Sequence, residues 1–257
     1  MSTCTIAQLK EKLHYLSHVD KNRKIFGASL IAYGDLTNLT SFSGLHNNLT
    51  CLPESIGNLI HLNCLFFSDN QLQDIPVQIG NLINLETLSF CGNQLKKLPD
   101  SIGNLINLKY FHVRRNQLSL LPESIKNLHS LEILNLHSNQ LEMIPDVLVN
   151  LTKLQRLELY NNKLLALPDS IGNLSQLKEL SIFCNSITTL PETIGSLYRL
   201  EDLRMNSNCI RQLPESIYNL KNLYQLQMSG NQLTFLSESI GRWAKLRFWN
   251  VSYNSLQ

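Results

Sequence analysis

Cysteine and histidine are the residue types in this chain best suited to covalent or metal chemistry. Cys91, His112 and His137 fall in three consecutive segments of alternating pattern, and a thiolate beside an imidazole is a nucleophile–base pair. Cys91 and His137 occupy equivalent positions in two segments that have one other segment between them. In a sheet this spacing separates the two residues by about 9.6 Å. Direct contact is out of reach at that distance, and a metal needs closer ligands around it. Nucleotide-binding, hydrolase and metalloprotease motifs are also missing from the sequence. We therefore predict no catalytic residue, no metal site and no cofactor.

Aromatic and arginine side chains offer a different chemistry, the recognition of another protein. They gather at the outward positions of the same segments, together with several carboxylates. Such residues are enriched at interface hot spots because they bury a large area at modest entropic cost. The predicted partner-binding surface consists of Tyr110, His112, Arg114, Arg115, His137, Arg156, Glu158, Tyr160, Glu179, Phe183, Asp202 and Arg204.

The charges of this surface follow an order along the chain. Arg114, Arg115 and Arg156 precede the acids, which begin at Glu158. This order predicts a partner with complementary charges. The alternative interpretation is that these residues only give the array the polar lining that solubility requires.

A strict internal period defines the elements that must position this surface. Eight prolines recur every 23 residues from Pro53 to Pro214, and an asparagine series keeps the same interval from Asn47 to Asn254. Two unrelated residue types with one period and a fixed offset indicate a stack of similar coils, which is a solenoid.

One coil, residues 131–153, shows what each unit contains. The segment from residue 131 to residue 136 ends in an alternating pattern of leucines, at Leu131, Leu134 and Leu136. This pattern predicts a short strand with one buried face. Asn139 follows at a turn, where its amide is expected to pair with nearby backbone and form a ladder with its equivalents. Proline then opens a short helix at its first position, with an acid after it. In six coils a glycine is expected to end that helical turn.

This pattern resembles the leucine-rich repeat family, with a match over residues 36–257. The 23-residue "LPxxI" unit is similar to the cytosolic Ras-group type, which includes small-GTPase scaffolds, polarity scaffolds and secreted bacterial effectors. The resemblance implies an α/β solenoid, or horseshoe, of about ten units. A parallel sheet would line its concave face, and short helices or 3₁₀ turns would cover its convex face. It also implies a protein-binding module, a scaffold or an effector, whose partner is a small GTPase or another signalling protein.

Residues 1–35 do not follow the repeat. Ile6, Leu9, Leu13 and Leu16 lie on one helical face, so we predict an N-terminal helical cap over the end of the core. The alternative is a localisation or partner-binding helix, suggested by its lysines. At the other end Ser237 replaces proline, while Trp243 and Trp249 replace leucines. Either these tryptophans close the array or a further domain follows.

Bulk composition limits the location and the partners of the chain. Its 257 residues carry a net charge of only +2. A membrane-spanning helix needs an apolar run of about 18 residues or more, and the sequence contains no such run, so no membrane span is predicted. Six scattered cysteines indicate free thiols in a reducing compartment. The predicted location is the cytoplasm, or the host cytosol for a bacterial effector.

Two other functions remain open at this stage. The array could be the substrate-recognition part of a larger enzyme, such as an effector ubiquitin ligase, whose catalytic domain is absent from these residues. Nucleic-acid binding through the arginines is disfavoured by the acids between them.

Overall fold

The structure, a computed structural model, describes residues 38–257. Contacts divide these residues into two compact units. The first contains the described residues up to Leu118 together with Pro122–Leu131, and the second contains Ser119–Leu121 and Glu132–Gln257. The predicted cap over residues 1–35 lies outside the described residues, so the proposed domain division stays a prediction.

Both units are built from three-residue strands that alternate with five-residue 3₁₀ helices. The first unit contains β1 (Ser41–Ser43), η2 (Glu54–Asn58), β2 (Cys64–Phe66), η3 (Val77–Asn81), β3 (Thr87–Ser89), η4 (Asp100–Asn104), β4 (Tyr110–His112) and η5 (Glu123–Asn127). The second contains β5 (Ile133–Asn135), η6 (Asp146–Asn150), β6 (Arg156–Glu158), η7 (Asp169–Asn173), β7 (Glu179–Ser181), η8 (Glu192–Ser196), β8 (Asp202–Arg204), η9 (Glu215–Asn219), β9 (Gln225–Gln227), η10 (Glu238–Arg242) and β10 (Phe248–Asn250).

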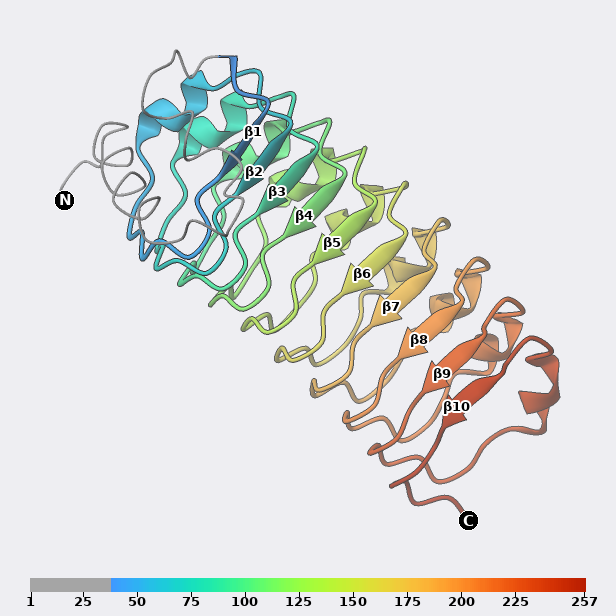
Figure 1. The fold of residues 1–257 in the computed structure, drawn as a ribbon. Helices are drawn as coiled ribbons and strands as arrows, with labels where there is room; N and C mark the ends of the chain where they lie inside the picture. The colour runs from blue at the N-terminus through green and yellow to red at the C-terminus, as the bar shows by residue number, and fades with distance from the viewer. Residues whose placement is uncertain (1–37) are drawn as a thin grey trace. The chain divides into compact units, whose positions relative to one another are not determined.

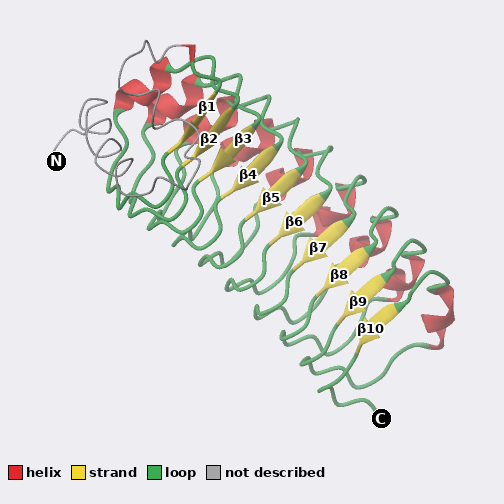
Figure 2. Ribbon diagram, viewed as in Figure 1, coloured by secondary structure: helices red, strands yellow, loops and turns green. Residues whose placement is uncertain are grey.

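Within each unit the strands pair in parallel and in sequence order. Leu88 pairs with Phe111 in the first unit, and Leu157 pairs with Leu180 in the second. Each strand thus aligns with the equivalent strand of the next coil, one full repeat along the chain. In each unit the strands form one face and the 3₁₀ helices the opposite face (Figures 1 and 2). The predicted solenoid of parallel strands and short 3₁₀ turns is confirmed.

The core lies between these two faces and consists of the periodic apolar residues. The central strand residues Leu134, Leu157 and Leu180 have no exposed surface, and neither do the helix residues Ile194 and Ile217. The outer two residues of most strands remain partly exposed. Burial of the periodic residues therefore leaves the outward strand positions free to vary in side-chain type.

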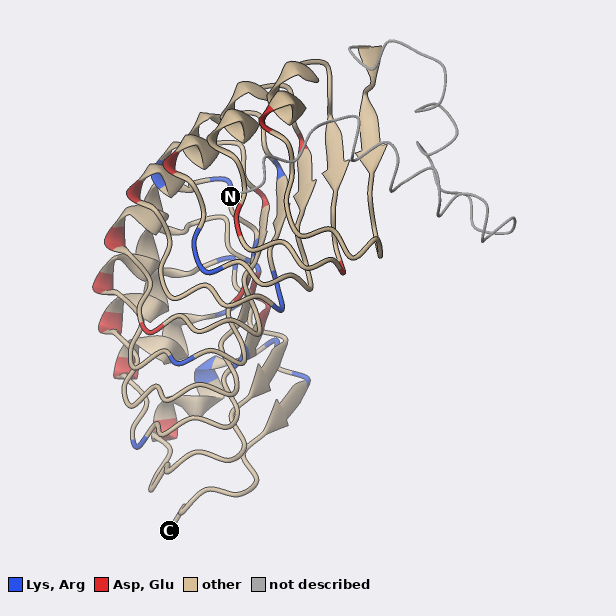
Figure 3. Ribbon diagram, turned by 90° about the vertical axis from the view of Figure 1, so that its left-hand side faces the viewer, with Lys and Arg blue, Asp and Glu red and all other residues tan. Residues whose placement is uncertain are grey.

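The prolines lie one residue earlier than predicted. Pro168 is the residue before η7, in an extended conformation with φ −67° and ψ 147°, and Asp169 is the first helical residue. Proline suits this position because its fixed φ matches the extended entry and its missing N–H removes one unpaired donor. Acids recur at the starts of the 3₁₀ helices in both units, as Figure 3 shows.

The glycines have a different role from the one predicted. Gly195 lies inside η8, with a φ that any residue can adopt. A Cβ atom built on it would lie 2.3 Å from the carbonyl oxygen of Ser216 in the next coil. Glycine is therefore needed here for the close approach of successive helices, and not to end the helical turn.

The predicted asparagine ladder is confirmed and joins each coil to its neighbours. The Asn208 Oδ1 atom accepts a hydrogen bond of 3.0 Å from the N–H of Ile187. Its Nδ2 atom donates to the carbonyls of Ile182 at 3.0 Å and Met205 at 3.1 Å. Asn208 is 7% exposed, so these bonds satisfy backbone groups that water does not reach.

The two C-terminal tryptophans differ in their packing. Trp243 is buried, and its indole N–H donates to the carbonyl oxygen of Ile217 at 3.1 Å. Trp249 takes the strand position of Leu226, which is fully buried, yet it is 46% exposed. Only Trp243 therefore covers the core as a plug would. Over residues 38–257, no helix has the length and apolar character to cross a bilayer.

Removal of one ladder amide should lower stability without changing the surface. Asn208→Ala leaves buried backbone groups unpaired, so we expect the free energy of unfolding to fall by about 1–3 kcal/mol. Urea denaturation followed by circular dichroism measures this change. The control is Asn173→Ala, because Asn173 is exposed at the end of η7. Equal effects of the two substitutions would contradict a structural role for the ladder.

Candidate functional site

The strand face of the second unit presents three rows of side chains. A row contains the residues at equivalent positions of successive coils, because each strand aligns with its neighbour in exact repeat register. The first and third strand residues form two rows, and the residue two positions beyond each strand forms the third. Residues far apart in sequence thus become neighbours on one surface.

The third row begins with three stacked aromatic rings, which we call the aromatic row: His137, Tyr160 and Phe183. The ring centroids of His137 and Tyr160 are 4.0 Å apart with planes at 13°. Those of Tyr160 and Phe183 are 4.2 Å apart with planes at 10°. His137 is buried, whereas Tyr160 and Phe183 are half-buried. Each ring fixes the rotamer of the next, so the row is an ordered apolar surface that is open to solvent on one side.

Beside the aromatic row lies a charged cluster that consists of Arg156, Glu158, Glu179, Asp202 and Arg204. Arg156 donates to a carboxylate oxygen of Glu179 on the next strand at 2.6 Å. Arg204 instead donates to Asp202 on its own strand, through Nη2 at 2.7 Å and Nε at 3.0 Å. Glu158 accepts a hydrogen bond of 2.5 Å from Asn135. The cluster has three carboxylates and two guanidinium groups.

These pairs hold both arginines in the charged form. The hydrogen bond to Glu179 raises the pKa of Arg156, with Glu158 adding to the effect and partial burial opposing it. The hydrogen bond to Asp202 raises the pKa of Arg204 in the same way. Both guanidinium groups are therefore positively charged throughout the physiological pH range.

The expected order of arginines followed by acids is wrong for this unit. The guanidinium of Arg156 lies against Glu179, and that of Arg204 lies against Asp202, so each arginine is paired with an acid instead of being separated from the acids. Row membership follows from sequence spacing, but the choice of partner depends on side-chain conformation. Asn135 is an outward strand residue by its spacing but is not among the predicted contact residues, because an amide at this position does not by itself indicate a bond to Glu158.

The remaining predicted site residues belong to the first unit. Tyr110 and His112 are the outer residues of β4, and both are half-buried. Arg114 and Arg115 follow the strand and are exposed. Arg115 has a φ of 55°, a left-handed conformation that costs a non-glycine residue about 1–2 kcal/mol. Tyr110, His112 and Arg114 alternate with buried residues, whereas Arg115 lies in the bend that follows. Their part in binding a partner stays a prediction.

Within residues 38–257, no group of three histidine, cysteine or acidic residues is arranged to hold a metal ion. The described cysteines, which are Cys51, Cys64, Cys91, Cys184 and Cys209, are free thiols. The arrangement of rings and paired charges is suited to contact with another molecule.

Comparison with protein families agrees with the repeat pattern. The sequence matches the family described as "Leucine-rich repeat region" over residues 38–116 and 100–190. It matches a second description, "Leucine rich repeat", over residues 175–233. The chain therefore belongs to the leucine-rich repeat family. No curated protein matches its sequence.

Solved structures of similar fold include proteins of bacteria and plants. A functional domain of InlJ from Listeria monocytogenes has a TM-score of 0.76 and 25% identity, covering 86% of this chain and 46% of that one. The leucine-rich repeat ectodomain of GASSHO1/SCHENGEN3, a membrane receptor kinase of Arabidopsis thaliana, has a TM-score of 0.72 and 28% identity. That match covers 86% of this chain and 30% of the receptor chain, which was solved with Casparian strip integrity factor 2. A leucine-rich repeat protein of Leptospira interrogans has a TM-score of 0.55 and 24% identity, and the match covers 100% of this chain and 89% of that one. This chain thus spans less than half of the first two proteins.

The ion pair between Arg156 and Glu179 should contribute little to stability. Their side chains are 42% and 40% exposed, and pairs open to solvent contribute at most about 1 kcal/mol. We therefore expect a double-mutant cycle of Arg156→Met and Glu179→Gln to give a coupling energy below about 1 kcal/mol in urea denaturation. A coupling above about 2 kcal/mol would show that the pair is needed for folding.

Proposed function

We propose that the strand face of the second unit binds a protein or peptide partner, with the aromatic row as its apolar anchor. The observation that carries this proposal is the stacking of the three rings at 4.0 and 4.2 Å on a solvent-facing surface. If the rings lay inside a buried core, core packing alone would explain their stacking. Tyr160 and Phe183 are instead half-exposed. Pre-ordered aromatic side chains lose little entropy when a partner covers them, so the row is ready to bind.

The charged cluster specifies the kind of partner. Because the arginines of the cluster already pair with acids of the same face, the surface does not attract a strongly charged molecule. A partner must instead place an apolar group on the aromatic row and satisfy the paired charges with its own polar groups. This requirement favours a polypeptide over a nucleic acid, whose affinity depends on unpaired basic groups.

The similar structures support a polypeptide ligand. The Arabidopsis receptor ectodomain was solved in complex with Casparian strip integrity factor 2, and the plant peptide hormone receptor RGFR1 was solved in complex with RGF2. The match to RGFR1 has a TM-score of 0.71 and 27% identity, and it covers 41% of the receptor chain. We therefore extend the binding of a protein or peptide to this chain as part of the proposal.

The form of the repeat supports a more specific proposal for the repeat type, the location and the partner of this protein. We assign the chain to the 23-residue "LPxxI" type and place it in the cytoplasm, as a scaffold whose partner is a small GTPase or another signalling protein. The same assignment includes a bacterial effector that acts in a host cytosol. We give the array no catalytic role of its own. Tyr110, His112, Arg114 and Arg115 are proposed as further contact residues in the first unit.

Truncation of two rings should abolish binding while the fold is retained. For the double variant Tyr160→Ala and Phe183→Ala, we expect partner affinity to fall at least about 30-fold, as for hot-spot residues. Loss of the ring contacts should lower the free energy of unfolding by no more than about 2 kcal/mol. Quantitative affinity capture from cell lysate, followed by titration of the captured protein, measures the first effect. Thermal melting measures the second.

The matched control is Tyr198→Ala. Tyr198 is a tyrosine with 64% exposure that follows η8, away from the strand face. The control should capture the same protein as the wild type. If every captured protein binds the double variant and the wild type equally, the aromatic row is not the binding surface.

A further inference from the structure

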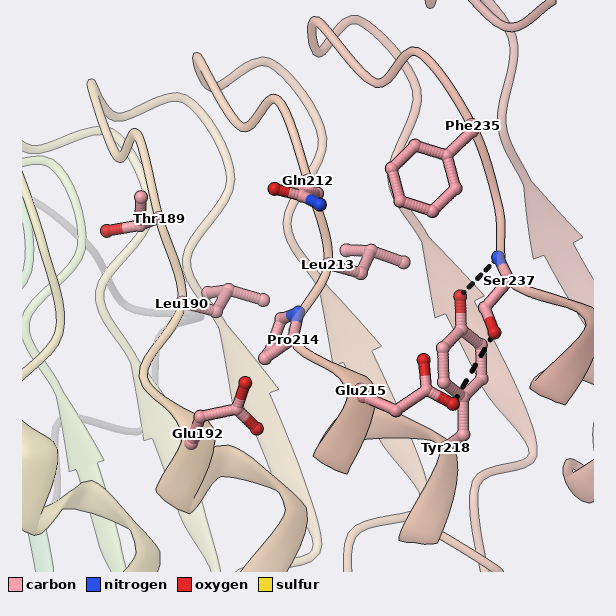
Figure 4. Close-up of a pocket in the computed structure, with 10 residues that line it drawn as sticks. All are labelled: Thr189, Leu190, Glu192, Gln212, Leu213, Pro214, Glu215, Tyr218, Phe235 and Ser237. Carbon is pink, nitrogen blue, oxygen red and sulfur yellow. Dashed lines mark hydrogen bonds between the residues drawn. The ribbon is translucent and has the colours of Figure 1, made fainter.

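A cavity of about 390 Å³ lies in the second unit, away from the strand face. Three successive coils line it: residues 189–192, 212–218 and 235–237. Figure 4 shows these three segments running side by side. None of these residues belongs to the aromatic row or the charged cluster, so the cavity is a separate feature of the molecule.

Two departures from the repeat build the far wall of this cavity. Tyr218 occupies the helix position of Gly195 and Gly241, and Ser237 occupies the position of Pro214. Because Ser237 keeps the N–H that proline lacks, it donates a hydrogen bond of 3.1 Å to the Tyr218 hydroxyl oxygen. The Tyr218 ring also packs on Trp243, with centroids 4.8 Å apart. The two departures from the repeat are thus in direct contact.

The floor of the cavity is apolar and partly open. Leu190, in the preceding coil, is 6% exposed, whereas its equivalent Leu213 is half-buried. Pro214 is likewise half-buried, and the Phe235 ring is 49% exposed. Leu213 is therefore more accessible than its equivalents in the preceding coils.

The charge of the cavity is entirely negative. Glu192 and Glu215 both line it, and none of its lining residues is basic. Glu192 accepts a hydrogen bond of 3.3 Å from the N–H of Ser216, and Glu215 accepts bonds from the hydroxyl groups of Ser237 and Ser239. These bonds orient the carboxylates and leave other lone pairs available. In Figure 4 both carboxylates lie on one side of Pro214, with Phe235 on the other.

We propose that this cavity binds an arginine side chain of a partner polypeptide. The methylene stem would lie on Leu213 and Pro214, and the guanidinium would donate to Glu192 and Glu215. A planar guanidinium can donate to two carboxylates at once, here one from each of two successive coils, while Phe235 lies on the other side of Pro214, where it would border the methylene stem. Basic side chains bury their stems on apolar surface in this way while the charge stays in contact with polar groups.

Nuclear magnetic resonance titration of the full chain tests the proposal. The probes are N-acetyl-arginine amide and its uncharged isostere N-acetyl-citrulline amide, each up to about 20 mM because so small a ligand binds weakly. We expect the arginine probe to shift the backbone amide signals of Leu213, Phe235 and Ser237. The citrulline probe should leave them in place. Equal shifts with both probes, or none with arginine, would overturn the proposal.

Two pairs of substitutions distinguish arginine binding in this cavity from a general attraction of arginine to acidic side chains. Glu192→Gln with Glu215→Gln keeps acceptor oxygens but removes both charges, so we expect arginine affinity to fall about tenfold. The matched control is Asp146→Asn with Asp169→Asn, which removes two acids from the equivalent position of earlier coils and should have no effect. An equal loss in the control would show that the acids act only as a diffuse field.

Two further variants complete the design. Phe235→Ala should weaken arginine binding without changing the remaining spectrum, because Phe235 is an exposed ring. Tyr160→Ala with Phe183→Ala should leave arginine binding unchanged, since those residues lie on the strand face. If the latter variant loses arginine binding, the probe binds the strand face and the cavity assignment is wrong.

Discussion

The buried asparagine ladder is the interaction on which the rest of this structure depends. At each turn after a strand the chain passes through a left-handed residue, such as Ser207 with a φ of 55°, and then reaches the asparagine. The asparagine side chain accepts from one earlier coil and donates to carbonyls of that coil and its own. Buried backbone groups need such partners. An inserted or deleted residue would misplace the amide, so the ladder keeps the length of the coil constant.

This fixed register explains why a functional surface can be built from single residues in separate coils. Parallel strands lie about 4.8 Å apart, and flat rings at equivalent positions can tilt slightly and stack at the 4.0 and 4.2 Å seen in the aromatic row. The side chains of the strand face carry no part of the core. They can therefore change between coils, while leucine, asparagine and proline preserve the geometry beneath them.

The sequence predicts those features that depend on register, and it does not predict those that depend on side-chain conformation. Its period gave the strand centres, the asparagine ladder and the rows that hold Tyr160 and Phe183. It could not show that Arg204 bonds to Asp202 on its own strand, because an arginine has several carboxylates within reach. The glycines were misassigned to helix ends because spacing alone does not reveal a contact of 2.3 Å between coils.

The structural effect of a residue that departs from the repeat depends on its position in the coil. A new residue on the strand face alters only the surface, so Tyr160 or Phe183 disturbs nothing beneath it. A new residue at a glycine or proline position instead lies where successive coils meet, as Lys126 and Val149 do at the glycine position of their coils. Tyr218 and Ser237 bond to each other across this junction, since the phenol oxygen accepts from an N–H that exists only because proline is absent. This bonded pair, the half-buried Leu213 and two oriented carboxylates together line the proposed cavity. This combination, more than the presence of acids, distinguishes the cavity from the acidic positions of the other coils.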